Sequence, residues 1–156
     1  MRSPGYAGIV VALCLLTGVP AMAESVLSVL SRARLLGTWA ASCSAGASTN
    51  NWFVTWYAAS NGTARRRSLR GPGQPPLDGA IDSAELLSPT LIRVRMRNDD
   101  PNWGNVNGRV YDVLMDISGG HQRTISSVGG DGQVIIRDGK FVSSGSPSVV
   151  AERCVQ

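Results

Sequence analysis

Apolar and polar residues alternate along much of this chain, and this alternation is typical of β-strands with one buried face. In residues 91–97, Ile92, Val94 and Met96 alternate with three arginines. Other segments alternate in the same way or are rich in β-branched and aromatic residues: 38–43, 51–59, 64–70, 80–87, 109–118, 121–128, 133–137, 140–143 and 149–155. The pattern therefore predicts about eight to ten short strands.

Only residues 25–36 carry apolar residues at helical spacing, and we expect a short helix there that ends at Gly37. Turn signals connect the strands. Asn61-Gly62 predicts a hairpin with a type I′ turn, and Asp138-Gly139 predicts a second tight hairpin. No helix is expected between strands, so the strands should pair antiparallel in an up-and-down barrel or, alternatively, a sandwich.

The first 23 residues have a different character from the rest. Arg2 precedes an apolar run that is too short to cross a bilayer, and Ala21-Met22-Ala23 follows it. This order is typical of a cleavable secretory signal. We therefore expect a signal peptide over residues 1–23, a single domain over 24–156, and a secreted or periplasmic protein without a stable membrane anchor. A lipid anchor on Cys14 and an uncleaved membrane anchor are the alternatives.

Two cysteines, Cys43 and Cys154, remain once Cys14 leaves with this signal. An even pair in an exported domain predicts a disulfide. A redox or metal-binding pair is the alternative, but the chain has no C-x-x-C motif and one histidine. The bond would bring the first and last strands together. Those strands are neighbours in an up-and-down barrel, so the pair favours a barrel over a sandwich.

Gly37-Thr38-Trp39, directly after the predicted helix, resembles the G-x-W signature of lipocalins. In that family the tryptophan closes one end of a β-barrel, and a basic residue near the last strand packs over its ring. The resemblance implies these barrel-closing roles for Trp39 and Arg153 in a small, exported, lipocalin-like (calycin-like) barrel. It covers the helix and the first and last strands, whereas Tyr111-Asp112 does not match the family's middle Thr-Asp-Tyr motif. Trp39 as an ordinary core aromatic is the alternative.

Charge changes this picture little. The formal net charge is +4, and loss of Arg2 with the signal would lower it by one, which is too small to predict nucleic-acid binding. Arg93, Arg95 and Arg97 share one strand face, and residues 65–70 carry further arginines on both faces. We expect Asp112 and Asp116 of the next strand to pair with the 93–97 stripe. An anion-binding surface for lipid or phosphate is the alternative.

Aromatic residues gather in a chain that has few of them. Trp52 and Trp56 share a face of one predicted strand, and Trp103 lies in a polar loop that would border a barrel rim. Core packing explains Trp52 and Trp56 as well as a ligand-lined mouth does. A protein-binding rim is a further possibility.

Residues that could support catalysis or metal binding do not form a recognisable set. His121 follows two glycines in a turn and has no nucleophile motif near it in the sequence. Asp99 and Asp100 could offer oxygen ligands to calcium, but they lack the EF-hand spacing and suit turn capping equally well. We expect no catalytic residues, no metal and no cofactor.

The sequence therefore favours a non-enzymatic exported barrel that binds a small apolar or amphipathic ligand through Trp52, Trp56 and Trp103. The alternative is a protein-interaction module, such as an envelope inhibitor or adaptor, that binds a partner protein through the loops around Trp103 and residues 71–76. Fold alone does not separate the two, because small barrels serve both functions.

Overall fold

A computed structural model describes residues 24–155. The predicted signal peptide lies outside the described residues. One helix, α1 (Val26–Arg32), precedes ten strands: β1 (Gly37–Ala40), β2 (Phe53–Ala58), β3 (Ala64–Leu69), β4 (Leu77–Ser88), β5 (Leu91–Asn98), β6 (Val110–Asp116), β7 (His121–Gly129), β8 (Val134–Arg137), β9 (Lys140–Phe141) and β10 (Val150–Cys154). Two 3₁₀ turns, η1 (Pro101–Val106) and η2 (Ser118–Gly120), flank β6. No helix within residues 24–155 is long and apolar enough to cross a membrane.

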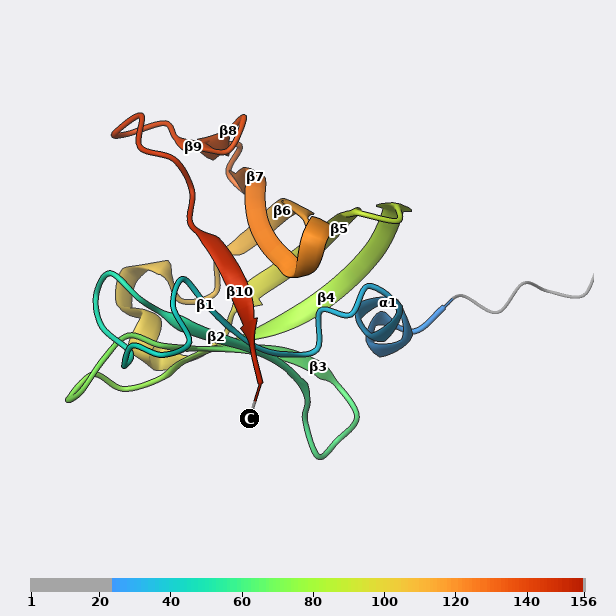
Figure 1. The fold of residues 1–156 in the computed structure, drawn as a ribbon, viewed down its shortest axis with the longest axis horizontal. Coiled ribbons are helices and arrows are strands. Elements are labelled where there is room, and N and C mark those ends of the chain that lie inside the picture. The colour runs from blue at the N-terminus through green and yellow to red at the C-terminus, as the bar shows by residue number, and fades with distance from the viewer. Residues whose placement is uncertain (1–23, 156) are drawn as a thin grey trace, which may run out of the picture.

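The strands form a closed antiparallel barrel, as the sequence predicts (Figure 1). Strands β1 to β7 pair in chain order, and β10 closes the cylinder by pairing with both β1 and β7. One edge of β7 pairs with two different strands. Its first residues pair with β10, whereas Ser127 and Val128 near its end pair with β8. The β8–β9 hairpin therefore leaves the cylinder at one end, and eight strands complete the barrel.

A disulfide joins Cys43 to Cys154, as predicted, with the two Cα atoms 5.3 Å apart. Cys154 ends β10 and pairs across the sheet with Thr38 of β1. Cys43 lies three residues beyond the end of β1, which is shorter than the predicted strand 38–43. The bond thus fastens the loop after β1 to the closing strand.

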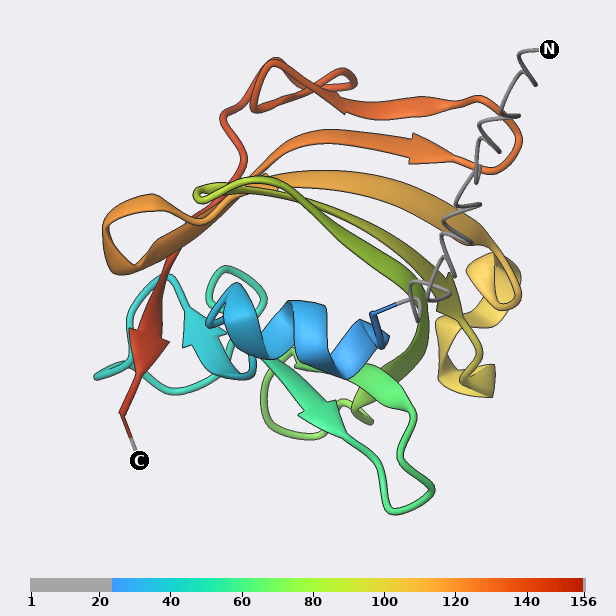
Figure 2. The same ribbon diagram turned by 90° about the vertical axis from the view of Figure 1, so that its right-hand side faces the viewer.

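Helix α1 ends earlier than predicted. Arg34 adopts a left-handed conformation (φ 55°), and the amides of Arg34 and Leu35 donate to the carbonyls of Ser31 and Leu30. This Schellman arrangement satisfies the last carbonyls of the helix, so Arg34 and not Gly37 terminates it. In Figure 2, α1 crosses one open end of the barrel.

The two hairpin turns differ from each other. Asp138 and Gly139 both have positive φ, the type I′ geometry expected of such a pair. In the β2–β3 turn only Gly62 has positive φ, and its amide donates to the carbonyl of Ala59. The predicted type I′ turn at Asn61-Gly62 is therefore wrong. One further residue in this loop leaves a single left-handed position, which glycine fills.

The barrel interior is most tightly packed at the end covered by α1. Leu30 and Leu35 are completely buried there with Ile92 and Val94. The predicted inward face of β5 and β6 is confirmed, since Ile92, Val94, Met96, Val113 and Met115 are buried and Ile117 packs against this cluster. The opposite end of the barrel is hollow.

Candidate functional site

A cavity of about 670 Å³ occupies the end of the barrel away from α1. This volume is typical of small-molecule sites, and an eight-stranded barrel can enclose one small cavity. Residues 26–36, which include α1, contribute nothing to its lining. Its walls include Met96, Val113 and Met115 of adjacent strands, and Ile136 and Phe141 of the β8–β9 hairpin. The hairpin that leaves the cylinder therefore forms one side of the cavity mouth.

All four tryptophans of the chain line this cavity. Trp39 and Trp56 are buried, with exposed fractions of 4% and 2%, whereas Trp52 is 38% exposed. Trp103 is half-buried and reaches the cavity from η1. The structure thus brings together the three residues predicted to contact a ligand, Trp52, Trp56 and Trp103, and adds Trp39 to them.

Trp39 and Arg153 lie opposite each other in the β1–β10 pairing. The indole N–H of Trp39 donates to the carbonyl of Leu35 at 2.8 Å, which ties the segment after α1 to the barrel. The Arg153 guanidinium donates to the carbonyl of Leu36 at 2.9 Å and lies against Gly37. The two residues implied by the lipocalin resemblance therefore both hydrogen-bond to the chain directly before the G-x-W segment.

Arg66 of β3 is the one charged side chain among the described residues that line the cavity. It pairs across the sheet with Trp56, so the two side chains share the inner face, and its guanidinium carbon lies 6.0 Å from the centre of the Trp56 ring. Burial lowers the pKa of Arg66 to about 10. The group therefore remains protonated at neutral pH.

Four buried side-chain polar atoms among the described residues lack a protein partner, and two of them belong to residues that line the cavity. The indole N–H of Trp56 has no acceptor, and the side-chain oxygen of Gln122 has no donor. The other two, the Ser68 hydroxyl and the Arg70 Nε, belong to residues outside the cavity lining. Buried polar groups are normally hydrogen-bonded, because an unmade bond costs about 1–3 kcal/mol. The cavity wall therefore offers unused donors and acceptors.

Side-chain hydrogen bonds hold the two loops at the mouth. Asn51 is buried and its amide donates to the carbonyls of Ser42, Ala45 and Gly46, which orders the loop between β1 and β2. At η1, Asp100 caps the turn by accepting from the amide of Asn102 at 2.8 Å. The loops that carry Trp52 and Trp103 are thus held in place before any ligand arrives.

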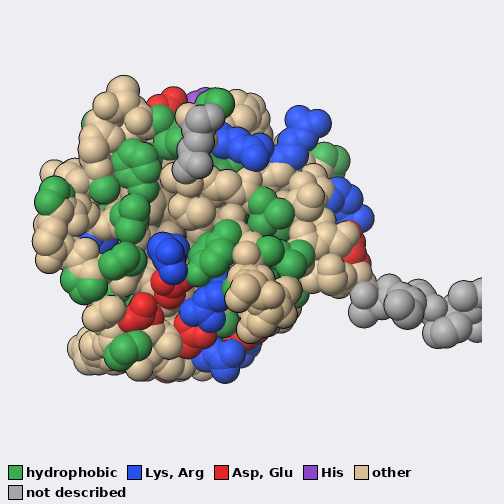
Figure 3. Space-filling view, turned by 90° about the horizontal axis from the view of Figure 1, so that it is seen from below, with side chains coloured by type: hydrophobic (Ala, Val, Ile, Leu, Met, Phe, Trp, Pro, Cys, Tyr) green, Lys and Arg blue, Asp and Glu red, His purple; other side chains and the backbone are tan. Residues whose placement is uncertain are grey.

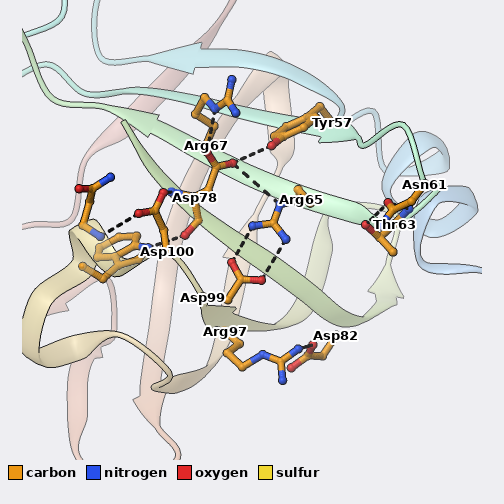
Figure 4. Close-up of polar contacts among 12 residues, drawn as sticks. Tyr57, Asn61, Thr63, Arg65, Arg67, Asp78, Asp82, Arg97, Asp99 and Asp100 are labelled. Atoms are coloured by element: carbon orange, nitrogen blue, oxygen red, sulfur yellow. Dashed lines mark hydrogen bonds and ion pairs between the residues drawn. The ribbon is translucent and has the colours of Figure 1, made fainter. Parts of the chain in front are cut away.

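A charged network on the outer face fixes η1 to the barrel (Figure 4). Asp78 of β4 accepts from Tyr57 at 2.6 Å and from Arg67 at 2.9 Å, and Arg65 pairs with Asp99 at 2.6 Å. The backbone of Asp78 takes part as well: its carbonyl accepts the indole N–H of Trp103, and its amide donates to Asp100. One side of the cavity mouth is thus attached to β4.

Tyr57 is expected to ionise at a higher pH than a free tyrosine. Burial is the main cause of its raised pKa, and the hydrogen bond to Asp78 adds to it. Because the folded state holds this proton more tightly, Tyr57 contributes stability below pH 10, and the contribution is lost as pH rises through the folded pKa. Phenolate absorbance, compared between the wild type and Tyr57→Phe, measures the shift. Asp78→Asn should lower this pKa, and a Tyr57 titration midpoint at or below pH 10 in the wild type would contradict the assignment.

The arginine stripe of β5 is paired, as expected, but with partly different partners. Arg95 pairs with Asp112 at 2.9 Å. Arg93 and Arg97 pair with Glu85 and Asp82 of β4, because those acids lie on the same outer face of the neighbouring strand. Asp116 caps the turn at Ser118 instead. Figure 3 shows basic and acidic side chains in contact over part of one face of the molecule.

The remaining candidates lie elsewhere. His121 begins β7, is exposed and faces Glu152 of β10 across the sheet. Asp99 and Asp100 are engaged with Arg65 and with the η1 cap. Within the described part of the chain, no three acidic, histidine or cysteine side chains gather into a group that could hold a metal ion.

Arg66 is the site residue that the sequence pattern did not single out. Alternation separates it from Arg65 and Arg67, and the β2–β3 register shows which face is the inner one by setting it opposite the inward-facing Trp56. The signal was present in the sequence: a short hairpin fixes which residues face each other, and a tryptophan predicted to point inward fixes the face of its partner.

Comparison of the chain with models of protein families, with curated proteins and with solved structures finds no match in any of the three. The lipocalin-like description of this chain therefore rests on its barrel. The function is argued below from the cavity.

Proposed function

We propose that this protein is a non-enzymatic barrel that binds a small amphipathic molecule inside its hollow end. The observation that carries the proposal is the cavity of about 670 Å³ lined by all four tryptophans. Aromatic and aliphatic side chains supply most of the wall, and a few polar groups interrupt it, which is the composition of small-molecule sites. A barrel whose only role is to display loops gains nothing from an unfilled core, since empty volume costs stability.

The hollow interior favours this function over the protein-interaction alternative. Trp52 and Trp103 would be the natural contacts for a partner protein at the rim, yet both also border the cavity. Trp103 is tied to the carbonyl of Asp78, so it is oriented to form part of a mouth. Ligand binding in the cavity therefore accounts for Trp52 and Trp103 without a separate surface for a partner protein.

The proposal includes export and a lipocalin-like mode of action. The disulfide between Cys43 and Cys154 supports an oxidising compartment, where such bonds persist. The apolar leader over residues 1–23 supports secretion or delivery to a periplasm. A small molecule with poor solubility needs a carrier or a scavenger in such a compartment, and a closed barrel with one mouth suits both tasks.

Nile red, a neutral apolar dye, is expected to bind the wild-type protein and to quench its tryptophan fluorescence, because every indole lies at the cavity wall. Ser127→Phe should reduce the affinity roughly tenfold by filling part of the cavity, since Ser127 is buried and lines it. Fluorescence titration gives both affinities.

Ser126→Phe is the matched control, because Ser126 does not line the cavity and precedes Ser127 on the same strand. Dye binding that is absent in the wild type, or that is equal in Ser127→Phe and the wild type, would contradict the proposal. Mass spectrometry of solvent extracts from natively exported protein would then identify the natural ligand.

A further inference from the structure

Resting on the proposed function, we infer that the ligand carries an anionic end group, a carboxylate on an apolar chain, and that Arg66 is its anchor inside the barrel. Arg66 sits on β3 with its side chain on the inner face, opposite Trp56. The partly accessible surface of this side chain borders the cavity. The structure thus places a cation where an apolar core would normally continue.

No residue in the range 24–155 neutralises this charge. The neighbouring arginines, Arg65 and Arg67, point outward and take Asp99 and Asp78 as partners. Strand alternation sends Arg66 to the opposite face, away from both acids. The described wall of the cavity contains no acidic side chain. A partly buried charge without an acidic partner is costly, so a bound anion would supply the partner that the chain omits.

A second unpaired donor belongs to the residue that faces Arg66 across the sheet. The indole N–H of Trp56 is buried and unpartnered, on the residue directly opposite Arg66. On the other side, Arg66 faces Gly79 of β4, which has no side chain to cover the guanidinium. A carboxylate has two oxygens with several acceptor positions, so it can accept from both donors at once. A single neutral hydroxyl would satisfy them less fully.

The rest of the wall selects an apolar chain behind this end group. Met96, Val113, Met115 and Ile136 are buried and line the cavity. Methionine side chains adapt to irregular partners, which suits an alkyl chain. A medium-chain alkyl carboxylate therefore matches both halves of the cavity better than a wholly apolar molecule or a cationic amphiphile.

The test compares three probes with the same alkyl chain: decanoate, decanol and decyltrimethylammonium. Each is titrated into the full mature protein at neutral pH, with tryptophan fluorescence and calorimetry as readouts. Decanoate should bind about tenfold to a hundredfold more tightly than decanol, the factor expected for charge-assisted hydrogen bonds. The cationic probe should bind least.

Arg66→Met should remove the preference for decanoate over decanol and leave decanol affinity within about twofold of the wild type. Arg66→Lys should keep part of the preference, because it retains the charge but loses the planar fork. Arg93→Met is the matched control: the same substitution on the outer face of β5, at an arginine that pairs with Glu85 outside the network that holds η1. It should leave the binding of all three probes unchanged.

A ligand-free readout separates an anchor from a structural residue. If Arg66 is held for a ligand, Arg66→Met should raise the thermal midpoint of the ligand-free protein by removing a partly buried charge that has no acidic partner. Decanoate should raise the midpoint of the wild type and not that of the variant. A variant with a lower midpoint than the wild type would mark Arg66 as structural and overturn the inference.

The outcomes distinguish this inference from the function on which it rests. Equal binding of decanoate and decanol by the wild type would overturn the anionic specificity and leave ligand binding intact. Unchanged decanoate affinity in Arg66→Met would overturn the role of Arg66. Failure of decanoate, decanol and Nile red to bind would overturn the proposed function together with the inference.

Discussion

Replacing Cys43 and Cys154 together by alanine is expected to lower the free energy of unfolding by about 4–5 kcal/mol. The bond closes a loop across a sequence separation of 111 residues, so its loss frees nearly the whole described chain in the unfolded state. It also fastens the loop that leads toward the cavity mouth to the last strand. Urea unfolding followed by far-ultraviolet circular dichroism measures the change.

Reduction of the wild-type protein is the control for this variant, because it breaks the same bond without changing an atom elsewhere. The reduced wild type and the double variant should unfold at the same urea concentration, and reductant should not affect the variant. An oxidised wild type that unfolds at the midpoint of the double variant would show that the closure of β1 on β10 is sufficient without the bond.

Trp39→Ala is expected to cost about 3–5 kcal/mol of stability, the range for removing a buried large aromatic. Trp39 is 4% exposed, packs in the cluster that includes the residues of α1, and donates to the carbonyl of Leu35. Its removal should also enlarge the cavity, because the ring forms part of the wall. Chemical denaturation gives the first effect.

Trp39→Phe separates packing from the hydrogen bond in that position. Phenylalanine keeps an aromatic ring but leaves the Leu35 carbonyl without its donor, so we expect a smaller loss of about 1–3 kcal/mol. Equal losses for alanine and phenylalanine would assign the role of Trp39 to its N–H. Losses below about 1 kcal/mol for both would refute a closing role for this residue.

Packing and charge divide the barrel into two halves. At the α1 end, Leu30, Leu35 and Ile92 fill the interior completely. At the other end, the chain leaves open space, unpaired polar atoms and the partly buried cation of Arg66. Natural proteins keep such costly features mainly where function requires them, because selection for stability alone would remove them. The hollow end is therefore where ligand binding is proposed.

Much of this architecture could be predicted from the sequence because it depends on local pattern. Alternation fixed the inward faces of β5 and β6, including Val94 and Val113, since a strand has only two faces. Turns that contain glycine placed hairpins such as β8–β9, because glycine tolerates the positive φ that a tight hairpin turn requires. The pairing of Cys43 with Cys154 followed from the number of cysteines and favoured closure of the barrel.

Other features arose only when the strands were assembled. The end of α1 depends on a left-handed Arg34, a residue without a strong preference for that conformation. The partners of Arg93 and Arg97 came from β4, because their choice depends on sheet register. The volume of the cavity depends on the summed volumes of the side chains that point into one end of the barrel. These side chains come from strands that are far apart in the sequence.

The sequence by itself determined short antiparallel strands with a disulfide between the first and last of them, and it favoured a barrel over a sandwich, because face alternation, turn chemistry and cysteine number can be counted along the chain. The tertiary structure alone decided that the barrel is empty at one end and that Arg66 points into it. The physical reason is that a cavity forms where the surrounding strands together supply too little side-chain volume, and a charge stays unpaired where none of them supplies an acidic partner. No single segment carries that information.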